Sequence, residues 1–218
     1  GPGRAVRTLR LVVLDLNGIL VFRGPRRPEG VAHLRYLGRQ KHNYVYERPH
    51  SRGFLDFLFA KFDVGVWSSA MEHNVRGMID MVMTEKDKRQ LALVWHQRDC
   101  DIVPGRSAAD NPNKPLFLKD LRRLYAFPDF HGRYEASNTL LIDDSPEKIQ
   151  HNLKHTCYCP RTFDPGNTAD DALAEGGHLR DLLQRWSDSD LDIQTFLKQE
   201  TGIRIPSTVG AAGLSSAR

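Results

Sequence analysis

The amino-acid sequence predicts an α/β fold, in which a doubly wound and mostly parallel β-sheet is flanked by helices. Apolar runs of strand length recur along the chain, and segments with the helical spacing of apolar residues lie between them. Several runs, such as residues 139–143, are apolar almost throughout, which is typical of strands covered on both faces. With 218 residues, 40% of them hydrophobic, the chain is long enough to bury the core of one such domain.

The first half of the chain is expected to supply two strands, one helix and an excursion from the sheet. Residues 8–15 form the clearest strand, and residues 64–67 form a second buried one. Residues from about 20 to 50 are rich in Gly, Pro and Arg and contain the β-prone run 43–47, which predicts a small flap or hairpin insertion after the first strand. Residues 52–62 have the apolar spacing of a helix.

The second half is expected to alternate between helices and strands. In chain order the predicted elements are a helix over 71–83 capped near Ser69, a strand over 91–95, a loop over 97–113, a helix over 115–125, a strand over 139–143, a short helix capped by Ser145, a strand over 155–159 and an amphipathic helix beginning over 179–186. The helix over 115–125 is predicted because Pro115 suits a first helical turn.

The chain is expected to contain one domain. Residues 1–7 are interpreted as a cleavage scar and N-terminal arm, residues 8–200 as the domain, and residues 201–218 as a polar tail. No apolar run approaches the roughly 20 residues of a membrane span. The sequence favours the nucleus or the cytoplasm, while a mitochondrion or another organelle stays open if a targeting segment was removed.

Charge and cysteine content make two further classes of protein unlikely. The formal net charge is +4, but basic and acidic residues are interleaved, and the densest basic stretch, residues 23–28, contains two prolines and has the character of a solvated loop. Nucleic acid is therefore an unlikely partner. Three cysteines, Cys100, Cys157 and Cys159, are too few for a disulfide framework, and their spacing lacks the second pair of a zinc site.

Polar residues follow three of the predicted strands. They are Asp15 with Asn17, Ser68 with Ser69, and Asp143 with Asp144. Ligands of doubly wound sheets bind beyond the carboxyl ends of the strands, and carboxylates that converge there repel each other unless a cation lies between them. One such aspartate could simply cap a turn, but aspartates at two strand ends favour a site. Hard oxygen ligands without His or Cys indicate Mg²⁺ rather than zinc.

Four segments resemble the motifs of haloacid-dehalogenase-superfamily phosphatases. They are Asp-Leu-Asn-Gly-Ile-Leu at 15–20, Val-Trp-Ser-Ser-Ala at 66–70, Leu-Lys-Asp-Leu at 118–121 and Ile-Asp-Asp-Ser-Pro at 142–146. The flanking residues are more narrowly similar to FCP/SCP-type phosphatases, which act on the C-terminal domain of RNA polymerase II, and the Asp-Leu-Asn-Gly opening is similar to plant FCP-like proteins. The resemblance spans about residues 8–186. It implies a haloacid-dehalogenase-like fold without a large cap domain.

The resemblance also implies roles for individual residues. Asp15 would be the nucleophile that forms an aspartyl phosphate, Ser68 and the adjacent Ser69 would hold the phosphoryl oxygens, and Lys119 would balance their charge. Without the resemblance, Lys119 would be interpreted as a lysine on the surface of the helix over 115–125. The implied Mg²⁺ ligands are Asp15, the backbone carbonyl of Asn17, Asp143 and Asp144. The implied partner is a phosphorylated Ser/Thr protein segment, such as a polymerase C-terminal-domain-like peptide.

The sequence departs from the family pattern Asp-x-Asp-x-Thr at two positions. Asn17 replaces the second aspartate, which is the general acid and base of the family, and Ile19 replaces the threonine. Because asparagine exchanges no proton at neutral pH, turnover is expected to lose acid–base help worth about 10²–10⁴-fold. Three outcomes stay open: a slow phosphatase, a persistent aspartyl phosphate, or a pseudo-phosphatase that binds a protein segment without turnover. The retained carboxylates and Lys119 favour metal and phosphate binding with impaired hydrolysis.

Overall fold

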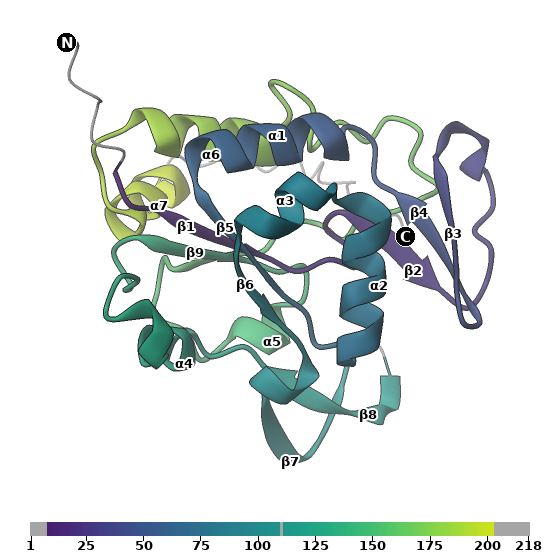
Figure 1. Ribbon diagram of the computed structural model, residues 1–218, viewed down its shortest axis with the longest axis horizontal. Coiled ribbons are helices and arrows are strands. Elements are labelled where there is room, and N and C mark those ends of the chain that lie inside the picture. Colours follow the sequence, from purple (N-terminus) through teal and green to yellow (C-terminus); the bar gives the residue numbers. More distant parts are fainter. Residues whose placement is uncertain (1–7, 110, 203–218) are drawn as a thin grey trace, which may run out of the picture.

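The computed structural model describes residues 8–109 and 111–202, with a five-stranded parallel sheet at its centre (Figure 1). The strands lie in the order β10 (Cys157–Tyr158), β9 (Thr139–Ile142), β1 (Leu11–Leu14), β5 (Asp63–Trp67) and β6 (Leu91–Trp95). Because β5 and β6 lie on one side of β1 and β9 and β10 on the other, the winding reverses at β1. The predicted fold class is confirmed, and the switch point beside β1 is where such sheets bind ligands.

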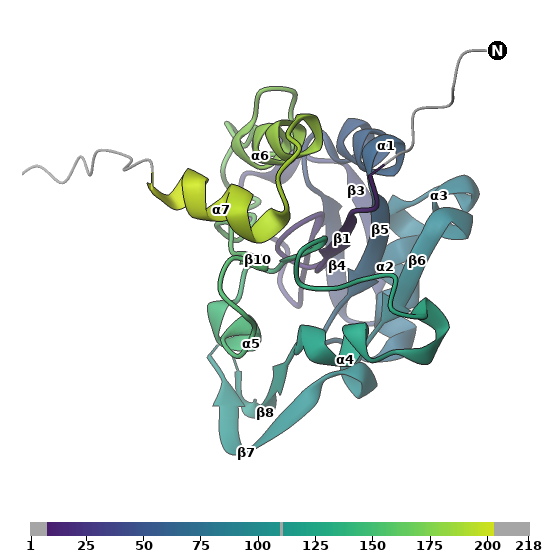
Figure 2. The same cartoon turned by 90° about the vertical axis from the view of Figure 1, so that its left-hand side faces the viewer.

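Alternate residues of the central strands face two different hydrophobic cores. Val12 and Leu14 pack in a cluster with apolar residues of helices on one face of the sheet, whereas Leu11 and Val13 pack in a cluster on the other. The helices of the first cluster are α1 (Ser51–Lys61), α2 (Glu72–Val82), α6 (His178–Asp188) and α7 (Ile193–Gly202), and the second cluster includes α4 (Leu121–Tyr125). Figure 2 shows α6 and α4 on either side of the sheet. Coverage of both faces explains the apolar runs.

The excursion after β1 folds into a small antiparallel sheet, called the flap here. Its strands are β2 (Val21–Gly24), β4 (Asn43–Glu47) and β3 (Tyr36–Gln40) in spatial order, with the short 3-10 helix η1 (Val31–His33). Arg48, which is only 3% exposed, anchors the root of the flap. Its guanidinium donates to Asp170 at 2.7 and 3.0 Å and to the carbonyl oxygen of Ile19 at 3.1 Å. The predicted insertion after the first strand is present.

The segment after β6 is a β-hairpin, which the sequence does not predict. A short 3-10 helix, η2 (Gln97–Asp99), precedes β7 (Asp101–Ala108) and β8 (Asn111–Leu118), which pair antiparallel. The hairpin lies at the bottom of Figure 1. The loop predicted over 97–113 and the helix predicted over 115–125 are therefore wrong in this stretch.

The physical reason lies in the prolines and the position of the helix cap. Pro104 and Pro112 interrupt the strand pattern, and the pairing register shifts between Val103 and Ser107. The apolar run 116–118, which resembles part of a helical face, is buried as the end of β8 instead. The helix α4 begins only after Asp120, whose side chain accepts a hydrogen bond from the backbone of Arg122 at 2.9 Å.

The remaining elements are close to the predictions, with five differences. The N-cap of α2 is Met71, two residues beyond Ser69. An additional helix, α3 (Glu85–Gln90), begins at a capping box on Thr84, and α7 follows α6. The strands β1 and β10 are each shorter than predicted. Ser145 occupies the N-cap position of α5 (Pro146–Ile149), as predicted, but its hydroxyl donates to Asp144 at 3.2 Å and makes no capping hydrogen bond. The 3-10 helix η3 (Pro128–Phe130) follows α4. The predicted arm and most of the predicted tail lie outside the described residues. Within those residues, no helix is long and apolar enough to span a membrane.

Candidate active site

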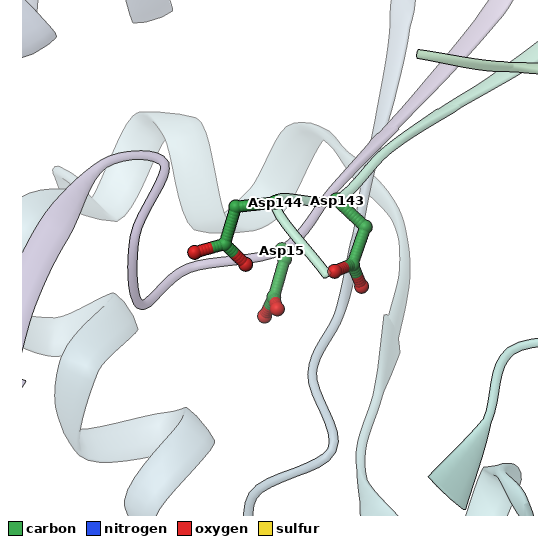
Figure 3. A group of neighbouring side chains, drawn as sticks. All are labelled: Asp15, Asp143 and Asp144. Atoms are coloured by element: carbon green, nitrogen blue, oxygen red, sulfur yellow. The ribbon is translucent and has the colours of Figure 1, made fainter. Parts of the chain in front are cut away.

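Three aspartates meet where the neighbouring strands β1 and β9 end. Asp15 follows β1 and Asp143 follows β9, and the register of these strands pairs Leu14 with Ile142. One carboxylate oxygen from each of Asp15, Asp143 and Asp144 lies within 4.8 Å of the others. Figure 3 shows Asp15 between the other two. We call these three side chains the carboxylate cluster; the structure brings them together as the sequence predicts.

Lys119 is fully buried against the cluster. Its side chain is 0% exposed, its Nζ lies 3.2 Å from Oδ2 of Asp15, and it donates a hydrogen bond to Oδ2 of Asp143. The residue lies between β8 and α4, so its expected place on a helix is wrong, and the interpretation as a surface lysine is excluded. The ammonium group of Lys119 thus contacts the residue that follows each of the two parallel strands β1 and β9.

The electrostatics of the cluster separate Asp15 from its neighbours. Burial acts to raise the pKa of Asp15, but the charge of Lys119 and the hydrogen bond from the backbone of Leu16 outweigh it, so the pKa is lowered. Burial raises the pKa of Asp143, although Lys119 opposes this effect, and burial together with the charge of Asp15 raises the pKa of Asp144. Asp15 is therefore the carboxylate that stays ionised most readily.

Gly18 lets the loop after β1 approach Asp144. Its φ is +88°, a conformation that glycine adopts without strain. A Cβ atom at this position would lie 2.0 Å from Oδ2 of Asp144, far closer than any contact allows. The backbone amide of Phe163 donates to the carbonyl oxygen of Gly18 at 2.8 Å, which fixes the loop against the chain beyond β10.

Ser68 and Ser69 lie at the end of β5, the strand beside β1, and each is only 4% exposed. The hydroxyl of Ser68 accepts a hydrogen bond from the backbone amide of Ala70 at 3.3 Å. Lys114 of β8 donates to the hydroxyl of Ser69 at 3.4 Å. The β7–β8 hairpin, which the sequence does not predict, therefore contacts Ser69 in the segment that is predicted to bind phosphate.

Asn17 and Ile19 are used by the fold. The side-chain oxygen of Asn17, an exposed residue, accepts a hydrogen bond from the backbone amide of Arg23 at 2.7 Å, at the start of the flap. Ile19 is 0% exposed and packs in the larger hydrophobic core. The backbone carbonyl of Asn17 as a metal ligand stays a prediction.

No sequence motif singles out one further residue near this cluster. Lys148 on α5 is only 9% exposed, and its positive charge acts to lower the pKa values of Asp15, Asp143 and Asp144. Its backbone carbonyl accepts a hydrogen bond from the amide of Lys119 at 2.8 Å. Its position four residues after Asp144, in a helix capped by Ser145, is the only indication that the sequence offers.

The donor set of the cluster suits a hard divalent cation. Three carboxylate groups converge, and their mutual repulsion contributes to the raised pKa values of Asp143 and Asp144. A cation between them would relieve this repulsion, and oxygen-only ligation is the chemistry of Mg²⁺ and Ca²⁺.

The chain matches known proteins over most of its length. The family model described as NLI interacting factor-like phosphatase matches residues 10–193. An uncharacterized FCP1 homology domain-containing protein of Schizosaccharomyces pombe is 30% identical over 159 residues, which are 67% of this chain and 59% of that protein. A putative CTD phosphatase-like protein of Invertebrate iridescent virus 6 is 24% identical over 186 residues, 81% of this chain and 98% of that protein.

Among solved structures, a variant of the fission yeast RNA polymerase II CTD phosphatase Fcp1 bound to beryllium fluoride is similar with a TM-score of 0.47 and 14% identity. That similarity covers 90% of this chain and 55% of Fcp1. This chain thus spans between one half and three fifths of the fission yeast proteins that it matches. Because the family model covers the central sheet, the flap and the strand-end residues together, the chain belongs to the NLI interacting factor-like phosphatase family, the FCP1 homology domains.

Proposed function

We propose that this domain is an Mg²⁺-dependent phosphatase-like domain that attacks phosphoserine or phosphothreonine in a protein segment with Asp15 and turns over slowly. One observation carries the proposal: the buried carboxylate cluster with Lys119 bonded to Asp15 and Asp143. Buried aspartates at separate strand ends are costly to maintain unless they serve a site. Family membership supplies the reaction class.

Each residue has a chemical task in this proposal. Asp15, kept ionised by Lys119 and by the amide of Leu16, attacks phosphorus, and the bond from phosphorus to the substrate oxygen breaks. Ser68 and Lys119 hold the non-bridging oxygens. Water then attacks the aspartyl phosphate, which restores Asp15 and releases inorganic phosphate.

The metal would be held by the carboxylate cluster, with the backbone carbonyl of Asn17 as a further ligand. When bound, Mg²⁺ neutralises charge on the phosphoryl group. The family resemblance favours Mg²⁺ within the class of hard cations.

The slow step follows from Asn17. An amide neither protonates the leaving oxygen nor deprotonates the attacking water, so both steps lose about 10²–10⁴-fold. In the first step, a substrate with a good leaving group can compensate for the missing acid. In the second step the leaving group is always the Asp15 carboxylate, so the loss of the base is not compensated. We therefore infer that the phosphorylated domain accumulates during turnover.

The substrate class rests on the small size of the insertions. Asp15 directly precedes the flap, and Lys119 directly follows the β7–β8 hairpin. Both insertions are short β-structures and neither is a large cap domain, so the proposed substrate is an extended phosphopeptide, such as a polymerase C-terminal-domain-like segment.

The alternative is a pseudo-phosphatase that binds a protein segment without turnover. It is favoured by the surroundings of Asn17 and Ile19, because the first serves the flap backbone and the second serves the core. In this alternative the flap carries the interaction, and binding needs neither Asp15 nor Mg²⁺.

An aryl phosphate assay separates the two functions, because an aryl leaving group needs little protonation. The wild-type domain is assayed with Mg²⁺ and with chelator, beside Asp15→Asn and the control Asp120→Asn, which changes another largely buried aspartate adjacent to Lys119. Acid-quenched samples are weighed by intact-protein mass spectrometry for a phosphoryl adduct.

We expect Mg²⁺-dependent turnover and an adduct in the wild type and in Asp120→Asn, and neither in Asp15→Asn. A wild-type domain with no turnover and no adduct, which binds a phosphopeptide equally well in chelator, would replace the proposal with the pseudo-phosphatase.

A further inference from the structure

Lys148 is a largely buried lysine whose ammonium group has no ion-pair partner among the described residues. It is only 9% exposed, yet none of the described carboxylate oxygens lies within 4.0 Å of its ammonium nitrogen. The stem of the side chain is packed in the protein, whereas the ammonium nitrogen is not fully buried and is open to a ligand. A lysine that is held in this way, with an unpaired and accessible charge, is suited to bind an anion.

The neighbours of Lys148 indicate which anion its ammonium group would bind. The charge of Lys148 acts on all three carboxylates of the cluster, so its ammonium group lies close enough to contribute to the charge of the site. The backbones of the two lysines are joined by the hydrogen bond from the amide of Lys119 to the carbonyl oxygen of Lys148. Lys148 is held in place because it lies only four residues after Asp144 and because its helix α5 packs against β8.

Lys119 and Lys148 differ in how many of their N–H donors are available to a ligand. Lys119 already contacts Asp15 and Asp143, which leaves it one of its three N–H donors. The ammonium group of Lys148 donates to none of the described residues, so all three of its donors are available within that part of the chain. Three carboxylates and two ammonium groups leave the site with one net negative charge, so a divalent cation makes it positive, and a phosphate dianion is then attracted.

We propose that Lys148 is a second phosphate-binding residue, whose ammonium group donates hydrogen bonds to the non-bridging oxygens of a phosphomonoester or of inorganic phosphate. The inference rests on the proposed function, which supplies the phosphate ligand. It assigns to Lys148 the phosphate contacts that Lys119, with two of its donors used by Asp15 and Asp143, can make with one donor only.

Calorimetric titration with inorganic phosphate in the presence of Mg²⁺ tests this assignment. Lys148→Met removes the charge and keeps the length of the side chain, Lys148→Arg keeps the charge, and Lys154→Met is the control at an exposed lysine nearby. Titration with Mg²⁺ alone and thermal unfolding are measured for each variant.

We expect Lys148→Met to weaken phosphate binding by about tenfold or more, the size of one lost charge-assisted hydrogen bond. Lys148→Arg should retain binding within about threefold, and Lys154→Met should match the wild type. Binding of Mg²⁺ alone should be unchanged or tighter in Lys148→Met, because a repelling charge is gone.

Two results overturn the assignment: phosphate binding by Lys148→Met at the wild-type level, or an equal loss of phosphate and Mg²⁺ binding in Lys148→Met and Lys148→Arg, which would make the residue structural. A wild-type domain that binds phosphate through Lys148 but lacks turnover refutes only the proposed function. Turnover that is unaffected in Lys148→Met refutes only this inference, and a wild-type domain that binds no phosphate refutes both.

Discussion

Asp15 has different surroundings on its two sides. On the charged side, formed by Asp143, Asp144 and Lys119, the buried ammonium group pairs with Asp15 and Asp143, and an oxygen of Asp144 lies within 4.8 Å of the other two carboxylates. On the neutral side, formed by Asn17 and Ile19, an amide holds the backbone of the flap and an aliphatic side chain fills the core. In the proposed function one side has the groups that would hold a cation and a phosphoryl group, while the other side serves the fold.

For the proposed function, the difference predicts that capture of a phosphoryl group and proton transfer are separable in this domain. Charge stabilisation is needed to form the aspartyl phosphate, whereas proton transfer governs departure of an alcohol and attack by water. The charged side supports the first requirement. The rate is therefore expected to depend strongly on the leaving group.

Asn17→Asp is the largest test of this comparison, because it gives the neutral side an acid. One carboxylate oxygen can keep the hydrogen bond from the amide of Arg23 while the other moves a proton. We expect turnover of a phosphoserine peptide to rise by about 10²–10⁴-fold, and turnover of an aryl phosphate to rise less. Rates with both substrates are measured in the presence of Mg²⁺.

The control is Asn17→Ala, which removes the hydrogen-bond acceptor and supplies no acid, so no gain is expected from it. If Asn17→Asp were no faster than the wild type with either substrate, the two sides would not divide the chemistry as described, and the pseudo-phosphatase would be favoured.

Gly18→Ala tests the charged side by displacing Asp144. The added Cβ would meet the carboxylate of Asp144 at 2.0 Å, so that side chain has to move. We expect Mg²⁺ affinity to fall by about 10–100-fold, as when the support of a metal ligand is changed. Calorimetric titration with Mg²⁺ measures the effect.

Gly132→Ala is the matched control, because Gly132 has a similar positive φ of +72° but nothing within 4 Å of its added Cβ. It reproduces the backbone strain without the collision. Equal losses of Mg²⁺ affinity in both variants would show that strain, and not the position of Asp144, governs the site.

The pH dependence of Mg²⁺ binding gives a smaller effect. Burial and the charge of Asp15 raise the pKa of Asp144, so this carboxyl keeps its proton to a higher pH than usual. A protonated carboxyl is no ligand; affinity is therefore complete above the raised pKa and falls as the pH drops through it, by about tenfold per pH unit. Asp144→Asn should bind weakly with a shallower slope, and a flat wild-type profile between about pH 4 and 7 would contradict the pKa shift.

The sequence allows the central sheet to be predicted because its strands are apolar on both faces, and it allows the cluster to be predicted because the aspartates directly follow strands that pair. The β7–β8 hairpin is missed because its prolines interrupt the alternation of a strand and Pro115 suits a helix start. That error places Lys119 on a helix, although its motif is correctly noticed.

Lys148 is missed for a different reason. Its burial depends on how α5 packs against β8, and no local pattern encodes that packing. The structural use of Asn17 likewise depends on where the flap backbone returns. Patterns within a strand or helix can be inferred from sequence, whereas contacts between an insertion and the sheet require the fold. The chemical roles of the site residues stay predictions.

Asp87 provides the smallest test, since it is a buried carboxylate that serves stability alone. It accepts hydrogen bonds from the amide of Thr84 at 2.8 Å and from Arg52 at 2.7 Å, and these outweigh its burial and lower its pKa. Asp87→Ala should reduce the free energy of unfolding by about 2 kcal/mol in urea at pH 7. Because the pKa of Asp87 is lower in the folded than in the unfolded state, the difference in stability between wild type and Asp87→Ala should shrink as the pH falls below about 4.

Turnover and Mg²⁺ affinity should stay unchanged in Asp87→Ala. The control is Glu85→Ala, which removes an exposed partner of Lys88 and should cost less than about 1 kcal/mol of stability. A loss of Mg²⁺ affinity in Asp87→Ala would mean that charges remote from Asp15 also govern the site, and the division between its two sides would no longer explain it.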